Sequence, residues 1–371
     1  MPNNKTIHGL RGLAALLVFV YHVQRAVVTG EFVRQPDESS LAFAAVELGR
    51  LGVDLFFMIS GLLIVASLHR HASIPRFLKN RIARIYPAFL VPHLIIFAVG
   101  PLIGYAWMAD LQVWEWGVHF LSNLLMLPGV FPLPIAQIVA WSLSYELAFY
   151  FLAAAAFSLA RSPNGWSKRC GQAVWLAVTA LLLWYHPRGW FFVAGVAVYG
   201  LTSAAAERKS EQTQQTLSQP QQPRKWPGEA VLGLAMLVLM FISYDMVLPA
   251  AIICGGVGFW VLVRQQDALS FVLQTRPLQY FGTISYSFYL WHSLVLFGTK
   301  RIFGRGGGLL GPGTLNLISF IAVSLAGSVI CAQLSYSLVE VRLTRRLFGK
   351  RQSAKRPQPL PTAQTTVRQA A

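Results

Sequence analysis

The sequence carries little charge for its length and has few cysteines. Only 12% of the 371 residues are charged and 55% are hydrophobic, with a mean hydropathy of +0.51. A soluble domain carries about twice that share of charged residues, so a soluble fold is disfavoured. Cys170, Cys254 and Cys331 lie far apart and form no C-x-x-C pair. The sequence therefore indicates neither a zinc site nor a disulfide framework.

Several enzyme signatures are also absent. The sequence contains no G-x-S-x-G, no H-E-x-x-H, no Walker A motif and no histidine followed five residues later by aspartate. These absences argue against an α/β-hydrolase, a zinc protease, a P-loop enzyme and a soluble acyltransferase.

Apolar runs of about 20 residues recur along nearly the whole chain, and they are continuous rather than alternating. This pattern predicts an all-α, polytopic membrane helical bundle rather than a β-barrel. The first run is too long for a signal peptide and no small-residue cleavage site follows it, so we expect it to be retained. We expect ten transmembrane helices, at 7–28, 47–68, 85–108, 138–160, 171–186, 189–206, 229–244, 246–263, 281–301 and 314–339.

The proline-containing segment 110–137 interrupts this series, and we expect a short or re-entrant helix at 118–127. The polar, glutamine-rich segment at 207–228 is expected to be a disordered cytosolic linker within a membrane domain that covers 1–340. Residues 341–371 are expected to form a basic, disordered cytosolic tail.

Charge predicts the orientation of the bundle. With both termini in the cytosol, the inside segments contain 24 of the 31 Lys and Arg residues, as the positive-inside rule requires. The net charge of +17 falls in loops and accompanies no nucleic-acid motif, so we expect no nucleic-acid partner. The lipid bilayer and an anionic cytosolic ligand are the expected partners.

Ionisable residues inside the expected spans are few, and such residues usually face the protein interior or a wet cavity. Arg11 and His22 are eleven residues apart on the first span, so they share a face about 16 Å apart along the axis. Imidazole can accept and return a proton at neutral pH, which makes His22 a candidate general base. His93 on the third span is expected to make a structural contact.

Two loop arginines and one buried carboxylate extend this set. In RFLKNRIARIYP, Arg81 and Arg84 lie three residues apart, and Pro87 is expected to begin the third span. The loop fits equally well an amphipathic helix on anionic lipid and a clamp for a phosphorylated ligand. Glu146, about two turns into the fourth span, is a candidate to orient His22, to bind a sugar hydroxyl or to pair with a buried arginine.

Hydroxyl and aromatic side chains gather on the ninth expected span, in GTISYSFYLWH. They suit carbohydrate, although an aromatic belt at the membrane interface has a similar composition. The candidates for acceptor binding or structural polar contacts are Asp54, Ser285, Tyr286, Tyr289 and His292. A bundle with such residues fits a transporter with a proton relay or a membrane enzyme.

Five segments of this chain resemble the integral-membrane acyltransferase 3 family. The Arg, ten residues, His pattern of Arg11–His22 is the most specific of them. The others, in chain order, are GVDLFFMISGLLI, FLKNRIARIYP, WSLSYE and GTISYSFYLWH. The match covers 8 to about 342.

The resemblance implies transfer of an acyl group, most often acetyl, from acyl-CoA in the cytosol to a hydroxyl of a glycan such as exopolysaccharide or lipopolysaccharide O-antigen. It further implies that His22 is catalytic, that Arg11 is essential and that Arg81 and Arg84 bind the donor. Acyl-CoA would be a co-substrate, with no bound cofactor and no metal, and the location would be the bacterial inner membrane. Acylation of a small cytosolic glycoside and proton-coupled export remain the alternatives.

Overall fold

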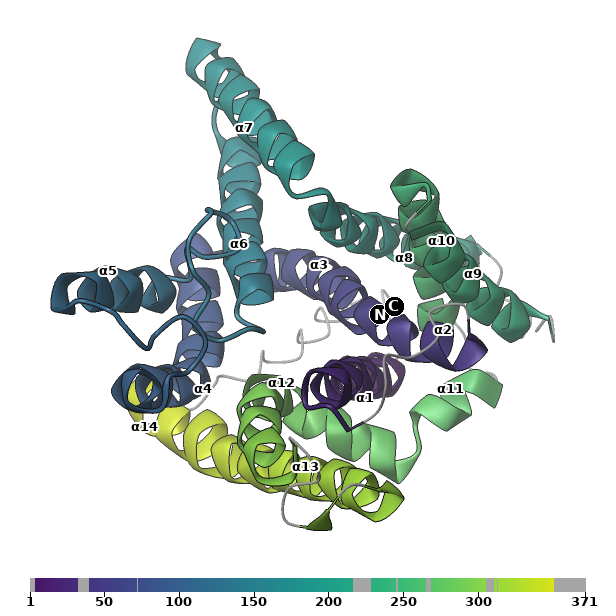
Figure 1. The fold of residues 1–371 in the computed structure, drawn as a ribbon. Coiled ribbons are helices and arrows are strands. Elements are labelled where there is room, and N and C mark those ends of the chain that lie inside the picture. The colour runs from purple at the N-terminus through teal and green to yellow at the C-terminus, as the bar shows by residue number, and fades with distance from the viewer. Residues whose placement is uncertain are drawn as a thin grey trace, which may run out of the picture.

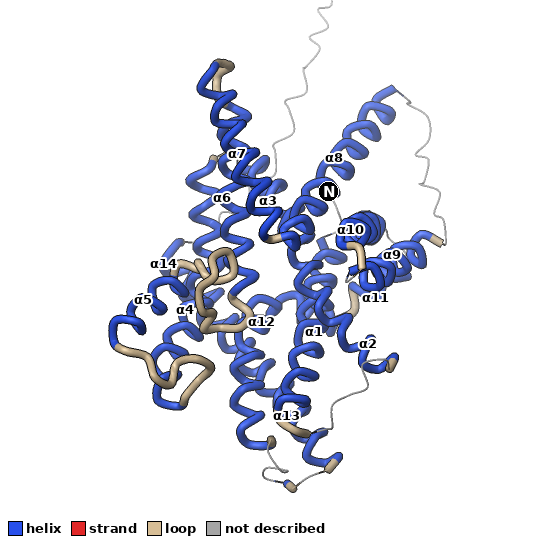
Figure 2. Tube along the Cα trace, turned by 45° about the horizontal axis from the view of Figure 1, so that its top comes forward, coloured by secondary structure: helices blue, strands red, loops and turns tan. Residues whose placement is uncertain are grey.

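The computed structural model describes residues 4–32, 40–71, 73–215, 228–244, 246–264, 268–304, 310–311 and 313–349. Within these ranges the regular elements are helices, which confirms the predicted all-α class (Figure 2). The longer α-helices are α1 (Asn4–Thr29), α3 (Leu51–His71), α4 (Ile74–Ile103), α5 (Val113–Leu124), α6 (Trp141–Arg161), α7 (Trp166–Tyr185), α8 (Trp190–Gln215), α9 (Glu229–Tyr244), α10 (Leu248–Arg264), α12 (Arg276–Phe303) and α13 (Thr314–Ser335).

Shorter elements connect these helices. They are α2 (Leu41–Glu47), the 3₁₀ helices η1 (Leu48–Arg50) and η2 (Pro187–Gly189), α11 (Ala268–Leu273), the π-helix η4 (Tyr336–Leu343) and α14 (Thr344–Phe348). Five helical segments in the described ranges are long and apolar enough to cross a membrane, at Lys5–Thr29, Phe43–Arg70, Ile74–Ile103, Trp141–Arg161 and Thr314–Phe348. The chain is therefore a helical membrane protein.

The third predicted span begins earlier than expected. Helix α4 starts at Ile74 with Pro75 in its first turn, so 74–84 is helix rather than loop, and Pro87 lies inside the helix. Proline suits a first turn because no intrahelical partner is lost there. The prediction that Pro87 begins the span was wrong, because this buried proline is tolerated within a helix held by its neighbours.

Two segments expected to be disordered are helical in part. Helix α8 continues through Gln215, into the predicted linker, and the C-terminal helices continue to Phe348, into the predicted tail. Glu, Lys, Arg and Gln have high helix propensity, and extending an existing helix needs no new nucleation. The rest of the linker, 216–227, and of the tail, 350–371, lies outside the described residues.

The short helix expected at 118–127 begins and ends earlier in the chain, because α5 occupies 113–124.

Helices α1 and α12 lie side by side (Figure 1), and their contacts show that they run in the same direction. Their paired contacts advance together along both helices, from Arg11 with Ser285 through His22 with His292 to Thr29 with Lys300. Glycines make this close approach feasible. A Cβ on Gly12 or Gly282 would collide with the Leu278 or His8 carbonyl oxygen, respectively.

We therefore predict that Gly12→Ala and Gly282→Ala lower the melting temperature of the purified protein in detergent, because either methyl group forces α1 and α12 apart. Overpacking of this kind costs about 1–3 kcal/mol. Gly298→Ala, also on α12, is the matched control because its added methyl group meets no atom within 4 Å. Equal melting temperatures for all three variants would contradict the close packing of α1 on α12.

Candidate active site

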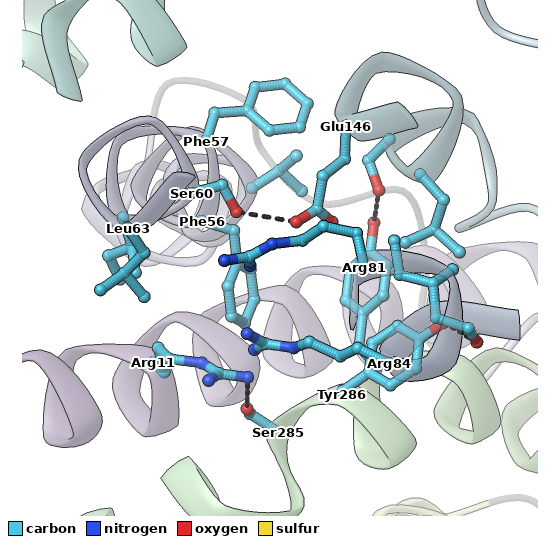
Figure 3. A pocket seen from close by; sticks show the side chains of 16 residues that line it. Arg11, Phe56, Phe57, Ser60, Leu63, Arg81, Arg84, Glu146, Ser285 and Tyr286 are labelled. Carbon is cyan, nitrogen blue, oxygen red and sulfur yellow. Dashed lines mark hydrogen bonds between the residues drawn. The ribbon is translucent and has the colours of Figure 1, made fainter. Parts of the chain in front are cut away.

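A pocket of about 700 Å³, counting the open space at its mouth, lies between α1, α3, α4, α6 and α12 (Figure 3). Arg11, Arg84 and Ser285 are the eighth, eleventh and tenth residues of their helices. The pocket thus lies roughly 12–16 Å from the N-terminal ends of α1, α4 and α12. Seven of the ten residues singled out from the sequence line it, namely Arg11, Arg81, Arg84, Glu146, Ser285, Tyr286 and Tyr289.

Three arginines dominate the charge of the pocket. The guanidinium groups of Arg11, Arg81 and Arg84 face the same space (Figure 3). The Arg81 guanidinium carbon is 5.6 Å from the centre of the Tyr150 ring, and the Arg11 Nη2 donates to the Ser285 Oγ over 3.0 Å. Glu146 contributes the sole acidic side chain among the lining residues. The pocket therefore has an excess of positive charge and suits an anionic ligand.

Glu146 is held by two hydroxyl groups. Ser60 donates to its Oε1 over 3.0 Å, and Tyr150 donates to the same oxygen over 2.5 Å. The carboxylate therefore lies in the pocket lined by Arg11, Arg81 and Arg84, which we call the arginine pocket. His22 is not among the residues that line it. Of the three roles considered from the sequence, this position fits pairing with buried arginines or binding a sugar hydroxyl better than orienting His22.

The hydroxyl groups of α12 join it to its neighbours. Tyr286 donates to the Ile85 carbonyl on α4 over 2.8 Å, and the Tyr289 hydroxyl lies 2.7 Å from the Ser142 Oγ on α6. Ser285 donates to the Gly282 carbonyl, so its oxygen is oriented to accept from Arg11. These contacts fix α12 against the helices that carry the arginines and the carboxylate.

His22 and His292 lie next to each other beyond the end of the pocket. Their ring centres are 5.1 Å apart, and the His292 ring is 5.9 Å from that of Tyr289, which lines the pocket. His292 is buried, with 1% of its surface exposed, and His22 is partly buried. Ring contacts through Tyr289 and His292 thus connect the pocket with His22.

Asp54 is outside the pocket and is held in an ion pair. Arg188 donates from Nε to Oδ1 over 3.0 Å and from Nη2 to Oδ2 over 2.9 Å, and Asp54 is fully buried. Burial alone would lower the pKa of Arg188, but the facing carboxylate raises it above its usual range. Asp54 therefore has the geometry of a structural contact.

Sequence reasoning missed Arg188, Ser60 and Tyr150. Arg188 lies in the short connection between the expected spans 171–186 and 189–206, where a single charge draws no attention. The signal that could have found it is Asp54, because an aspartate within a span needs a cation to pair with it. No local pattern pointed to Ser60, because it reaches Glu146 through the packing of α3 on α6. Tyr150 lies four residues after Glu146 on α6, a spacing at which side chains on one helix meet, so helical periodicity could have identified it.

A family model described as an acyltransferase domain, of the acyltransferase 3 type, matches residues 4–333. The chain is 24% identical to the acyltransferase MdmB of Streptomyces mycarofaciens over 95% of both chains. It is 26% identical to BcsY of Komagataeibacter xylinus, whose name describes a membrane-bound transacylase, over 91% of this chain and 83% of BcsY. No solved structure matches the chain.

A third relative is longer than this chain. The peptidoglycan O-acetyltransferase OatA of Listeria monocytogenes is 24% identical, and the matched region covers 92% of this chain and 56% of OatA. The comparisons confirm the predicted resemblance over nearly the whole chain.

We predict that Asp54→Asn destabilises the protein by about 3–5 kcal/mol, because it leaves the Arg188 guanidinium half-buried without its counter-ion. The double variant Asp54→Asn/Arg188→Gln should recover part of that loss. Arg25→Gln is the control, because Arg25 is 55% exposed in its ion pair with Glu47 and such pairs contribute about 1 kcal/mol or less. Thermal unfolding in detergent measures all three, and a double variant worse than Asp54→Asn would rule out the ion-pair role.

Proposed function

Because this chain belongs to the acyltransferase 3 family and is a membrane acyltransferase, we propose that it transfers an acetyl group from acetyl-CoA to a glycan hydroxyl. His22 acts as the general base, and the arginine pocket binds the donor. The observation that carries this proposal is the convergence of Arg11, Arg81 and Arg84 on one pocket. Guanidinium groups pair bidentately with phosphate, and CoA carries several phosphates.

The separation of Arg11 from His22 suits a donor of this shape. They are the eighth and nineteenth residues of α1, about 16 Å apart along its axis. CoA is anionic at one end and carries its thioester at the other, at the end of a long flexible arm. With the phosphates at the arginines, the arm runs along α1 past Tyr289 towards His22.

The chemistry needs one base and no covalent protein intermediate. His22 accepts the proton of the acceptor hydroxyl as that oxygen attacks the thioester carbonyl carbon. The tetrahedral intermediate collapses, the carbon–sulfur bond breaks, and the proton on His22 passes to the departing CoA thiolate. General-base assistance of this kind contributes about 10²–10⁴ in rate.

The topology supports donor access from the cytosol. In the proposed arrangement of ten spans with both termini inside, the N-terminal ends of α1, α4 and α12 face the cytosol, where acyl-CoA is found. The arginines of the pocket lie nearer those ends than His22 does. The strong inside bias of Lys and Arg supports this orientation, and the proposed location is the bacterial inner membrane.

A surface glycan such as exopolysaccharide or lipopolysaccharide O-antigen is the proposed acceptor. The name of OatA, a peptidoglycan O-acetyltransferase, supports this class because its matched region includes nearly all of this chain. To test it, membranes carrying the protein are supplied with isotopically labelled acetyl-CoA, and mass spectrometry identifies the molecule that gains the label. Label on a glycan supports the proposal, whereas transport of substrate across vesicles without acetyl-CoA would contradict it.

We predict that His22→Ala lowers transfer by about 10²–10⁴, since the acceptor proton then has no base. The variant should insert into membranes at the wild-type level. The exposed His69 is the control position, and His69→Ala should keep wild-type transfer. Wild-type transfer by His22→Ala would exclude the base role.

Donor binding should depend on the arginines of the pocket. Arg84→Gln is expected to raise the KM for acetyl-CoA by about 10–100-fold, the effect of losing a charge-assisted hydrogen bond. Arg11→Lys should also reduce transfer, because an ammonium group cannot reproduce the planar fork. Arg76→Gln serves as control because Arg76 is exposed on the same helix as Arg84. If Arg76→Gln and Arg84→Gln raise the KM equally, the arginines act only through general surface charge.

A further inference from the structure

The His292 side chain is buried among aromatic rings, and one of its neighbours is a second imidazole. Its ring centre lies 6.3 Å from that of Phe19, 6.1 Å from that of Phe288 and 5.9 Å from that of Tyr289. The nearest ring is that of His22, at 5.1 Å and tilted by 50°. A charged imidazolium would be costly in such surroundings, so His292 is neutral and carries one ring proton.

The backbone determines where that proton lies. The Nδ1 of His292 is 3.1 Å from the Phe288 carbonyl oxygen. A carbonyl oxygen only accepts hydrogen bonds, so Nδ1 carries the hydrogen and Nε2 keeps a free lone pair. His292 is thus fixed as a hydrogen-bond acceptor at Nε2.

That acceptor has no partner within the described part of the chain. The Nε2 atom of His292 is buried and unsatisfied. The hydroxyl of Tyr289 is already engaged, since it donates to the Val139 carbonyl and lies beside Ser142. Because a buried unpaired acceptor is costly, its position beside a second imidazole needs an explanation.

We propose that His292 is a positioning residue for His22: its Nε2 accepts the ring N–H of His22 during the reaction. This inference rests on the proposed base role of His22. The two ring centres are 5.1 Å apart without substrate, and catalytic hydrogen bonds are often long before substrate binds. With one nitrogen of His22 held as a donor, the other keeps the lone pair that takes the acceptor proton.

The same bond stabilises the protonated intermediate. When His22 has accepted the proton of the glycan hydroxyl it is an imidazolium, and its N–H to His292 becomes a charge-assisted hydrogen bond. The proton then leaves His22 for the CoA thiolate, and His292 itself exchanges no proton. His292 therefore acts on the rate of transfer rather than on donor binding.

His93 provides a contrast within the same chain. It is also buried among aromatic rings, those of Phe89, Phe97 and Phe120, and its Nε2 is also unsatisfied. Among the described residues, however, no second histidine ring lies against it. The variant His93→Leu therefore reports the effect of removing a buried histidine without removing a partner of His22.

The experiment compares His292→Leu, His292→Gln and His93→Leu in purified protein. The glutamine side-chain oxygen reaches the position of an imidazole Nε2 and can accept the same bond. Two readouts are taken: the kcat and the KM for acetyl-CoA, and the rate at which diethyl pyrocarbonate modifies His22, followed by peptide mass spectrometry. The second readout does not depend on transfer activity.

We expect His292→Leu to lower kcat about tenfold with an unchanged KM for acetyl-CoA, and to slow His22 modification about two- to tenfold. His292→Gln should restore most of both, and His93→Leu should change neither. An unchanged modification rate in His292→Leu, or equal losses in the leucine and glutamine variants, would overturn the inference. Absence of transfer by the wild type with the modification pattern intact would contradict the proposed function alone.

Discussion

The close parallel packing of α1 on α12 is the constraint on which the site depends. Glycines at positions 12 and 282 let the two backbones approach, and the contacts then advance together along both helices. This arrangement gives Arg11 a hydrogen-bond partner in Ser285 and places His22 against His292. A shift of one helix along the other by a single turn would separate both pairs at once.

A second constraint is the cost of charge within a membrane domain. The bundle handles its charges in two different ways. Asp54 and Arg188 satisfy each other in a bidentate pair, which leaves little capacity for a ligand. The arginine pocket instead combines three guanidinium groups with a single lining carboxylate, and that carboxylate is held by Ser60 and Tyr150. The unbalanced charge is what a phosphorylated donor would neutralise.

The sequence predicted the features that depend on spacing along one helix. Helical periodicity predicts that Arg11 and His22 share one face, and that Arg81 and Arg84 share another. Three of these four residues, Arg11, Arg81 and Arg84, line the pocket. Features that depend on packing between distant segments were not predictable. The partner of Asp54 lies 134 residues away, and the contact of His22 with His292 spans 270 positions. Helix ends were also misplaced, because polar residues that extend an existing helix resemble a linker in composition.

The most direct test of the account is an experimental structure of the His22→Ala variant with acetyl-CoA bound. The account predicts that the CoA phosphates lie within hydrogen-bonding distance of Arg11, Arg81 and Arg84, and that the thioester reaches past Tyr289 to the side of α1 where residue 22 lies. Phosphates bound elsewhere, or a thioester directed away from α1, would contradict it.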